Sequence, residues 1–250
     1  MSGHSKWSSI KRKKGVTDAR RGQIFTKLIK EIIIATRLGG KDINANPRLR
    51  LAVEKSKENN MPKENIERAI KKGAGELPGA NYEEVLYEGY GPGGVAMMIY
   101  ATTDNKKRTT ASIRHILSKY GGNLGENGCV SWMFERRGHL TFSKKETDEE
   151  QLMEKAIEAG AIDVIDNKED DVYEVITEAK VFNEVRDALI RAGFKPQTDG
   201  IEMIPQSTVK LEGKDAERML NLMNKLDEDE DVSQVYANFD IPNEIMEKFQ

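Results

Sequence analysis

The sequence contains a single cysteine, Cys129, in 250 residues. It cannot form an internal disulfide, and this usage is typical of a protein from a reducing compartment. No apolar run approaches the roughly 20 residues that a membrane-spanning helix requires. The N-terminus carries charges with no apolar segment behind them, so no export signal is predicted. We therefore expect a cytoplasmic protein with no membrane partner.

Recognisable catalytic and metal-binding motifs are also missing. There is no Gly-x-Ser-x-Gly, Walker or His-Glu-x-x-His pattern. The three histidines, His4, His115 and His139, are widely separated and have no cysteine or carboxylate at ligand spacing. The acidic run at 227–231 lacks the glycine and alternating ligands of a calcium loop, so we expect a solvated turn. We predict no enzymatic activity, no cofactor, no metal and no small-molecule substrate.

A Gly-x-Gly-x-x-Gly pattern does occur at residues 89–94. A dinucleotide site needs this loop to run from a strand into a helix. Here an apolar segment with the character of a strand, residues 95–99, follows instead. The pattern therefore indicates the turn of a β-hairpin.

Charge is divided unevenly along the chain, although the net charge is only −3. Residues 1–79 hold 19 Lys+Arg and 8 Asp+Glu, a net charge of +11. The remainder holds 39 − 19 = 20 basic and 42 − 8 = 34 acidic residues, a net charge of −14. Such asymmetry indicates that the basic part binds nucleic acid. The alternative is a solvated, lysine-rich surface without a partner.

The basic part opens with a cationic run at 11–14, and an amphipathic helix is predicted over residues 18–38. Its apolar residues recur at helical spacing, Thr17 or Asp18 can cap its start, and Gly39-Gly40 can end it. One face of this helix is therefore expected to pack in a core. The cations beside that face are expected to bind a nucleic-acid partner, either DNA or ribosomal RNA. The candidate contacts in this region are His4, Lys6, Lys11, Arg12, Lys13, Lys14, Arg20, Arg21 and Lys27.

Two shorter helices are predicted next. The first starts at Pro47 and ends before Asn59-Asn60, and the second starts after Pro62 and ends at Gly73. Their short joint resembles a helix-turn-helix, although ordinary helical corners share this geometry. With the long helix they form a small basic bundle that a glycine-rich linker at 73–80 separates from the rest.

Beyond the linker the pattern alternates between strands and helices. Strands are expected at 84–90, 95–102, 130–134, 138–142, 161–165, 172–177, 200–204, 208–211 and 232–239, and helices at 106–120, 149–159, 181–191 and 214–226. The order β-α-β-β-α-β from residue 138 to 204 is that of the ferredoxin-like split unit.

The block before this unit lacks a complete sheet, and the tail after it contains the missing parts. We therefore predict a multi-domain α+β chain. Its parts are a basic helical domain with an N-terminal arm (1–79), a discontinuous α/β middle domain (80–132 plus 205–250) and an inserted ferredoxin-like domain (133–204).

A cationic segment lies between a buried strand and a helix of the middle domain. Asp104 or Asn105 can cap this helix, but Lys106, Lys107 and Arg108 occupy its first turn. The helix dipole disfavours cations at that end. An anion bound there, such as a phosphate, would account for them. These three residues complete our set of candidate nucleic-acid contacts.

Several of these segments resemble the YebC/PmpR family over the whole chain. The matching motifs are Gly3-His4-Ser5-Lys6-Trp7, Arg21-Gly22 with Phe25-Thr26-Lys27, Asn59-Asn60-Met61-Pro62-Lys63, Ile66-Glu67-Arg68-Ala69-Ile70, Tyr87-Glu88-Gly89-Tyr90-Gly91-Pro92-Gly93-Gly94 and Gly121-Gly122-Asn123-Leu124-Gly125. One departure is Lys107, which stands where the family pattern Thr/Ser-Asp-Asn-x-Asn-Arg-Thr has its second asparagine.

This resemblance implies a helical domain, an α/β middle domain and an inserted ferredoxin-like domain. It also implies a regulator of gene expression, since bacterial members are labelled probable transcriptional regulators that bind DNA. Mitochondrial relatives are translational activators, and bacterial members have been linked to ribosomes stalled on proline-rich stretches. The alternative is therefore a ribosome-associated translation factor.

Overall fold

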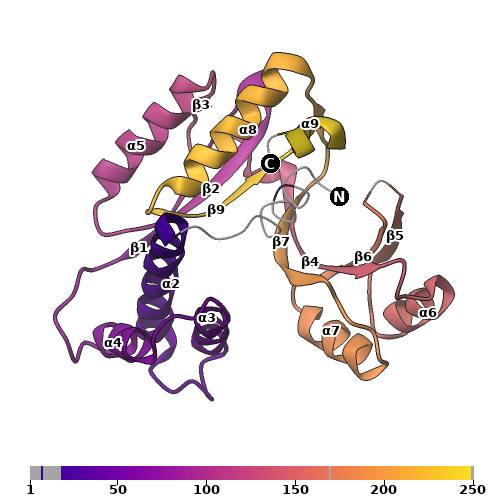
Figure 1. Ribbon diagram of the computed structural model, residues 1–250, viewed down its shortest axis with the longest axis horizontal. Helices are drawn as coiled ribbons and strands as arrows, with labels where there is room; N and C mark the ends of the chain where they lie inside the picture. The colour runs from indigo at the N-terminus through magenta and orange to yellow at the C-terminus, as the bar shows by residue number, and fades with distance from the viewer. Residues whose placement is uncertain (1–6, 8–17, 169, 249–250) are drawn as a thin grey trace. The chain divides into compact units, whose positions relative to one another are not determined.

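The computed structural model describes residues 7, 18–168 and 170–248 (Figure 1). Contacts divide these residues into two compact units. One is formed by residues 132–208, and the other combines residues 7–131 with 209–248.

The second of these units begins with three helices, α2 (Asp18–Gly39), α3 (Pro47–Glu58) and α4 (Lys63–Gly73), close to the predicted positions. Asn46 caps α3 by accepting a hydrogen bond from the Leu49 amide at 3.0 Å. A Cβ on Gly73 would lie 2.6 Å from the Ile33 carbonyl oxygen, so only glycine allows α4 to approach α2 this closely. The buried apolar residues of the bundle are Ile32, Ile33, Ala35, Leu49, Ala52, Val53, Met61, Ile66 and Ala69.

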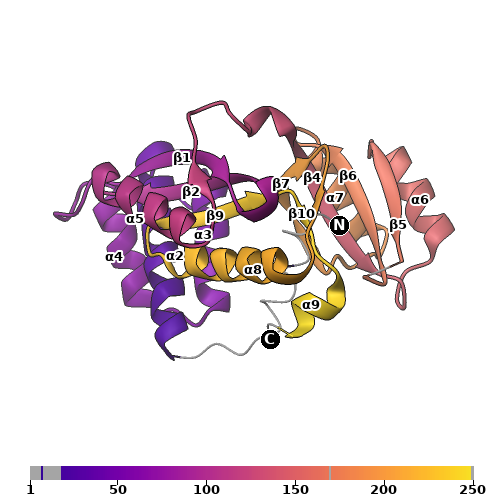
Figure 2. The same ribbon diagram turned by 90° about the horizontal axis from the view of Figure 1, so that it is seen from above.

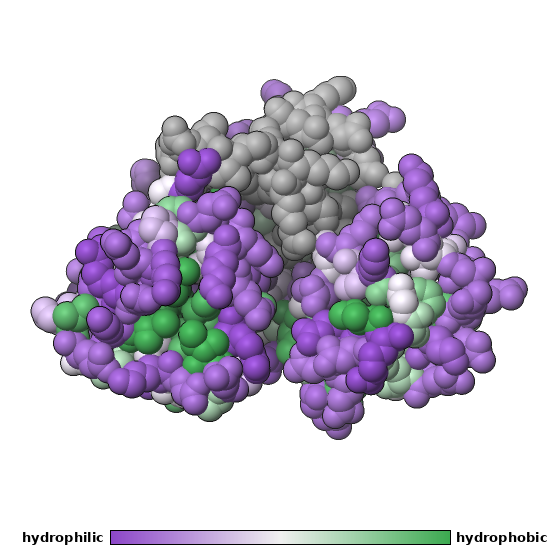
Figure 3. Space-filling model, turned by 60° about the horizontal axis from the view of Figure 1, so that its bottom comes forward, coloured by the Kyte–Doolittle hydropathy of each residue, from purple (hydrophilic) through white to green (hydrophobic). Residues whose placement is uncertain are grey.

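The outside of the bundle is mainly hydrophilic. Figure 3, in which the bundle occupies the left-hand lobe, shows polar side chains with some hydrophobic side chains between them. The large hydrophobic residues exposed on the bundle and on the linker that follows it are Leu38, Leu51 and Leu77.

A four-stranded antiparallel sheet follows, built from β1 (Glu83–Tyr90), β2 (Ala96–Thr103), β3 (Asn123–Leu124) and β9 (Val232–Ala237) in the order β3-β1-β2-β9. Helices α5 (Lys106–Lys119) and α8 (Gly213–Glu228) cover one face of it (Figure 2). The expected hairpin is confirmed: the glycine-rich pattern forms the 3₁₀ turn η1 (Pro92–Gly94) between β1 and β2. Met219 and Met223 of α8 are fully buried in this core.

The tail completes this sheet but differs from prediction at its end. The single strand expected over 232–239 breaks at Asn238, whose Oδ1 accepts a hydrogen bond from the Ala96 amide at 2.8 Å. After the break, β10 (Phe239–Asp240) pairs in parallel with β8 (Val209–Lys210). A short helix, α9 (Asn243–Lys248), follows.

The strand predicted at 130–134 is wrong. Residues 131–133 form a 3₁₀ turn, η2 (Ser131–Met133), and strand β4 (Phe134–Ser143) starts after it. The cause is Glu88 on β1, whose carboxylate accepts hydrogen bonds from the amides of Gly128, Val130 and Ser131 at 2.8–2.9 Å. Since these amides are used by a side chain, they cannot join a strand ladder.

Residues 132–208 form the predicted β-α-β-β-α-β unit. Besides β4 it contains α6 (Glu149–Glu158), β5 (Asp163–Asn167), β6 (Val172–Glu178), α7 (Phe182–Arg191) and β7 (Thr198–Pro205). The antiparallel order β5-β6-β4-β7 is that of the ferredoxin-like fold. Its core joins both helices to the sheet through Leu140, Phe142, Leu152, Ala156, Tyr173, Val175, Phe182, Val185 and Leu189.

The fold class is therefore the expected multi-domain α+β arrangement of a helical bundle, an α/β sheet domain and a ferredoxin-like unit. The exact domain boundaries proposed from the sequence stay a prediction.

Candidate nucleic-acid interface

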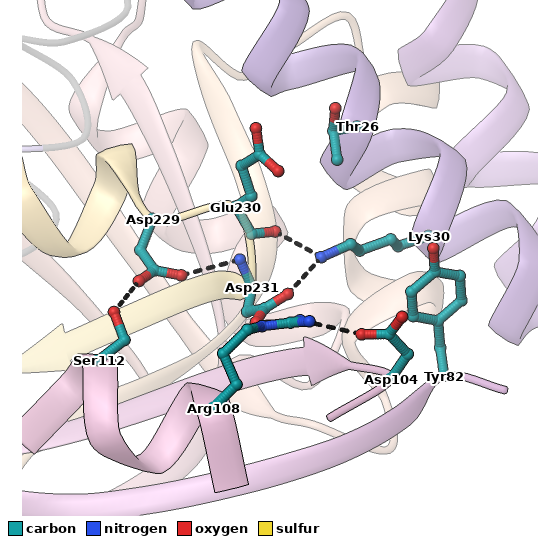
Figure 4. Close-up of a pocket in the computed structure, with 9 residues that line it drawn as sticks. All are labelled: Thr26, Lys30, Tyr82, Asp104, Arg108, Ser112, Asp229, Glu230 and Asp231. Atoms are coloured by element: carbon teal, nitrogen blue, oxygen red, sulfur yellow. Dashed lines mark hydrogen bonds and ion pairs between the residues drawn. The ribbon is translucent and has the colours of Figure 1, made fainter. Parts of the chain in front are cut away.

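The acidic segment at 227–231 is the point where α2, α5 and the turn between α8 and β9 meet (Figure 4). The expectation of a solvated turn is wrong at its most important residue, Asp231, which is only 8% exposed. The carboxylate of Asp231 accepts hydrogen bonds from Lys30 at 2.7 Å, Arg108 at 2.8 Å and Thr109 at 2.7 Å. Two cations thus balance this buried charge, as burial requires.

Helix α2 binds this turn through successive polar side chains on one face. The Lys30 ammonium also donates to the backbone carbonyls of Glu230 at 2.8 Å and Thr102 at 3.2 Å. One turn earlier, Lys27 donates to the Asp227 carbonyl at 2.6 Å. Cations beside the apolar stripe therefore hold α2 against the sheet domain, so Lys27 has an internal role in addition to any external one.

Helix α5 reaches the same turn from the other side. Ser112 donates to the Asp229 carboxylate at 2.7 Å, and Arg108 contacts Asp104 at 2.9 Å as well as Asp231. A cavity of about 540 Å³ lies at this junction, lined by Thr26, Lys30, Tyr82, Asp104, Arg108, Ser112, Asp229, Glu230 and Asp231. Figure 4 shows the charged groups of Lys30, Arg108 and Asp231 turned toward one another in it.

Charge pairing determines the electrostatics of the junction. Burial raises the pKa of Asp231, but hydrogen bonds from Lys30, Arg108 and Thr109 outweigh it and lower this pKa to about 2. The Asp231 and Asp104 carboxylates raise the pKa of Arg108. Burial, with the nearby Asp104 and Asp231 charges, raises the pKa of the Tyr82 phenol. At neutral pH Asp231 is therefore ionised and paired.

These contacts change the interpretation of the cationic first turn of α5. The anion inferred from the sequence beside Arg108 is supplied by the protein itself, as Asp231 and Asp104. Lys106 and Lys107 are different: both are exposed, and neither forms an ion pair with a residue that the structure describes. Asn105 caps the helix by accepting from the Arg108 amide at 3.1 Å.

The remaining candidates fall into two groups. Arg20 and Arg21 lie at the start of α2, where Arg21 is exposed. His4, Lys6, Lys11, Arg12, Lys13 and Lys14 lie outside the described residues. The structure thus brings Lys27 and Arg108 to one junction and leaves Lys106 and Lys107 in solvent at its edge.

A second buried polar cluster escaped sequence analysis. On the ferredoxin-like sheet, His139 Nε2 lies 2.8 Å from Glu174 Oε2, and His139 Nδ1 lies 3.5 Å from Glu202 Oε2. Burial lowers the pKa of His139, but Glu174 and Glu202 raise it overall to about 9. The partners are 35 and more positions away, and only the register of β4 with β6 and β7 brings them together.

The described residues contain neither a cluster of metal ligands nor a helix that could span a membrane. In residues 7, 18–168 and 170–248, no group of three or more His, Cys, Asp and Glu side chains could hold a metal ion. Over the same ranges, every helix is too short or too polar to cross a membrane.

Comparison with known proteins agrees with this architecture. Residues 5–76 match the family model described as TACO1/YebC protein N-terminal domain, and residues 82–239 match TACO1/YebC second and third domain. A crystal structure of a conserved hypothetical protein, Aq1575 from Aquifex aeolicus, is 53% identical with a TM-score of 0.78, covering 91% of this chain and 93% of that chain.

Curated relatives match over nearly their full length. A probable transcriptional regulatory protein of Geobacter sulfurreducens is 58% identical over 248 residues, which is 99% of each chain. One of the same description from Desulforapulum autotrophicum is 57% identical over 245 residues, which is 98% of each chain. On these matches, the chain belongs to the TACO1/YebC family.

Proposed function

We propose that this chain is a non-enzymatic, nucleic-acid-binding regulator of gene expression. The observation that supports this most is the charge division, a net +11 over residues 1–79 against −14 over the remainder. A basic segment on an otherwise acidic chain attracts polyanions through those of its cations that the chain's own carboxylates do not engage.

The internal ion pairs narrow the set of residues available to a partner. Lys30 and Arg108 are bound to Asp231, and Arg48 is bound to Glu31 and Glu84. We therefore assign the main phosphate contacts to the N-terminal arm and to the first turns of α2 and α5. These residues are Lys6, Lys11, Arg12, Lys13, Lys14, Arg20, Arg21, Lys106 and Lys107, with His4 as a further polar contact.

The names of the relatives favour DNA as the polymer and transcription as the process. On this proposal the chain contacts DNA mainly through phosphates, which position a protein without reading sequence.

A second candidate is a ribosome-associated translation factor, and one observation favours it. Helix α4 would be the recognition helix of a helix-turn-helix, but its solvent side carries Glu64 and Glu67 among its cations. Carboxylates on that side would be repelled by the phosphates flanking a major groove. A basic arm that contacts folded RNA without base reading does not need such a helix.

Crosslinking in cells, followed by sequencing of the bound nucleic acid, tests the proposal. Promoter DNA among the products supports transcriptional regulation, and ribosomal RNA supports the translation factor. Failure to recover either polymer above background would overturn nucleic-acid binding.

A charge-reversed protein, with Lys11→Glu, Arg12→Glu, Lys13→Glu and Lys14→Glu, is the matched control. It spares Trp7, which is buried in the core of the sheet domain, so packing is preserved. We expect recovery of nucleic acid to fall by at least an order of magnitude, because several phosphate contacts are lost. Equal recovery from both proteins would show that the arm is not the binding element.

A further inference from the structure

The charge on helix α5 is unusual for its part of the chain. From Asn105 to Gly125 there are five Lys and Arg residues and no Asp or Glu, although residues 80–250 contain 34 acidic residues. Without α5, these residues would carry 20 − 5 = 15 basic side chains against the same 34 acidic ones. A random surface of this acidic region would not produce an uninterrupted cationic helix.

The cations of α5 lie on its outer side. The inward positions are Thr109, Ile113 and Leu117, which are fully buried. The exposed positions from the first turn onward are Lys106, Lys107, Arg108, Ala111, Arg114, His115, Ser118 and Lys119. Figures 1 and 2 show this helix on the outside of its unit, with α8 beside it and the sheet behind it.

Apart from Lys106, three of these cations are not neutralised by the protein. Lys107, Arg114 and Lys119 form no ion pair with any residue that the structure describes, and Lys119 lies 5.8 Å from the centre of the Tyr120 ring. The nearby carboxylates are already engaged, Asp104 and Asp231 with Arg108 and Asp229 with Ser112. Arg108 is thus a positioning residue, and the other three remain for a partner.

Lys107 and Arg114, seven residues apart, lie on nearly the same side of the helix, whereas Lys119 lies about 140° further round it, on the other flank of the outer surface. With a rise of 1.5 Å per residue, Lys107 and Arg114 lie about 10 Å apart along the axis, and Arg114 and Lys119 about 7 Å. One strand of a duplex presents a phosphate about every 3.4 Å of its axis, so the axial distance of about 18 Å from Lys107 to Lys119 corresponds to roughly five nucleotides. The exposed positions include no Asn or Gln to pair with adenine and no carboxylate to pair with cytosine.

We infer that the outer side of α5 is a second nucleic-acid contact, separate from the basic arm, that holds the phosphodiester backbone without reading sequence. This inference rests on the proposed function. It assigns one phosphate to each of Lys107, Arg114 and Lys119. Linked to the arm through one chain, the two contacts bind the same polymer together and raise its affinity by effective concentration.

The test compares two triple variants of the full-length chain that lose the same charge. One is Lys107→Ala with Arg114→Ala and Lys119→Ala. The control is Lys180→Ala with Arg191→Ala and Lys195→Ala, three exposed cations of the ferredoxin-like unit. Anisotropy of labelled RNA and DNA duplexes, each in two unrelated sequences, is measured between 50 and 200 mM salt.

Each phosphate contact adds about 0.9 to the slope of log affinity against log salt concentration, so three contacts add about 2.7. Between 50 and 200 mM salt, the affinity of the parent should therefore fall about 40-fold more than the affinity of the α5 variant. The control should match the parent, and both sequences of each polymer should respond alike. If the α5 substitutions reduce the salt slope more for the RNA duplexes than for the DNA duplexes, the polymer that α5 binds is RNA, and the reverse result identifies DNA.

Several results would overturn the inference. Equal slopes for the α5 variant and the control would show that α5 is a solvated surface, and an effect confined to one sequence would show base reading. If the parent binds neither duplex, the proposed function itself fails. Should the triple variant lose stability, Lys107→Gln and Lys119→Gln alone must each lower the slope by about 0.9.

Discussion

Lys30 and Asp231, 201 positions apart in sequence, form a buried ion pair with 2.7 Å between Nζ and Oδ1. The pair joins α2 of the helical bundle to the turn that precedes β9, and Arg108 joins the same carboxylate to α5. The two basic elements assigned to nucleic acid are therefore fixed to each other through one acidic side chain.

The first prediction concerns this pair. Asp231→Asn leaves the Lys30 ammonium buried without a counter-charge, and breaking a buried pair in this way costs about 3–5 kcal/mol. We expect faster amide hydrogen exchange in α2 and α5, measured by mass spectrometry on the full chain. The ferredoxin-like unit should exchange at the parent's rate.

Glu230→Gln provides the matched control for that variant. It removes the same charge from the adjacent position, but the Glu230 side chain is exposed and only its carbonyl accepts from Lys30. Exchange in α2 should stay at the parent's rate. If both variants loosen α2 equally, net charge in the turn matters and the specific pair does not.

The second prediction is the acid response of the same group. The pKa of Asp231 is about 2 in the folded chain, against about 3.9 for an unperturbed aspartate. A lowered pKa stabilises the fold above pH 4, and this contribution of about 2 kcal/mol is lost as the pH falls from 4 to 2. Urea unfolding at pH 5, 3 and 2 should show a flatter pH dependence for Asp231→Asn than for the parent. Parallel curves would mean that Asp231 titrates normally.

The opposite sign applies to His139. Its pKa is raised to about 9, so its pairing with Glu174 stabilises the fold fully below pH 6.5 and is lost as the pH rises through 9. His139→Gln should unfold at a temperature lower by roughly 4–8 °C at pH 6, which corresponds to about 1 kcal/mol in a domain of this size. Calorimetry at pH 6 and pH 9 measures this, and the difference between variant and parent should shrink at the higher pH. A constant difference would indicate lost packing only.

Much of the fold could be predicted because it depends on local pattern. The stripe of α2, the proline that starts α3 and the glycine that ends α4 each act within a few residues of their own position. The strand-like segment that follows the glycine-rich pattern likewise distinguished a hairpin from a dinucleotide loop. The β-α-β-β-α-β order of elements along the chain also followed from the pattern of successive segments.

The misses depend on contacts distant in sequence. The strand expected at 130–134 failed because Glu88, 42 positions earlier, takes the amides of Val130 and Ser131. The acidic segment at 227–231 has the composition of a solvated turn, and only the fold brings Lys30 and Arg108 to Asp231. Charge composition shows how many cations a segment has, whereas their partners depend on tertiary structure.

The last prediction separates the three cations in the first turn of α5. Arg108 is bound to Asp104 and Asp231, whereas Lys106 and Lys107 are exposed without an ion pair among the described residues. Arg108→Ala should therefore cost about 1 kcal/mol of stability, since one of its partners is buried and the pair is partly solvated. Lys106→Ala with Lys107→Ala should leave stability unchanged or slightly higher, because cations at a helix N-terminus oppose the dipole.

For nucleic-acid affinity we expect the opposite ranking: the lysine substitutions should lower it more than a substitution of Arg108. The double lysine variant should lower affinity and reduce the salt slope by about 1.8, or 0.9 per lost phosphate contact, while retaining the parent's unfolding midpoint. Arg108→Lys keeps the charge but not the two-sided pairing geometry, so it should lose stability while binding stays close to the parent's. If Arg108→Lys instead weakens binding at full stability, Arg108 contacts the polymer and its pairing with Asp231 is secondary. If the double lysine variant unfolds early, those side chains are structural and the phosphate assignment for this turn is wrong.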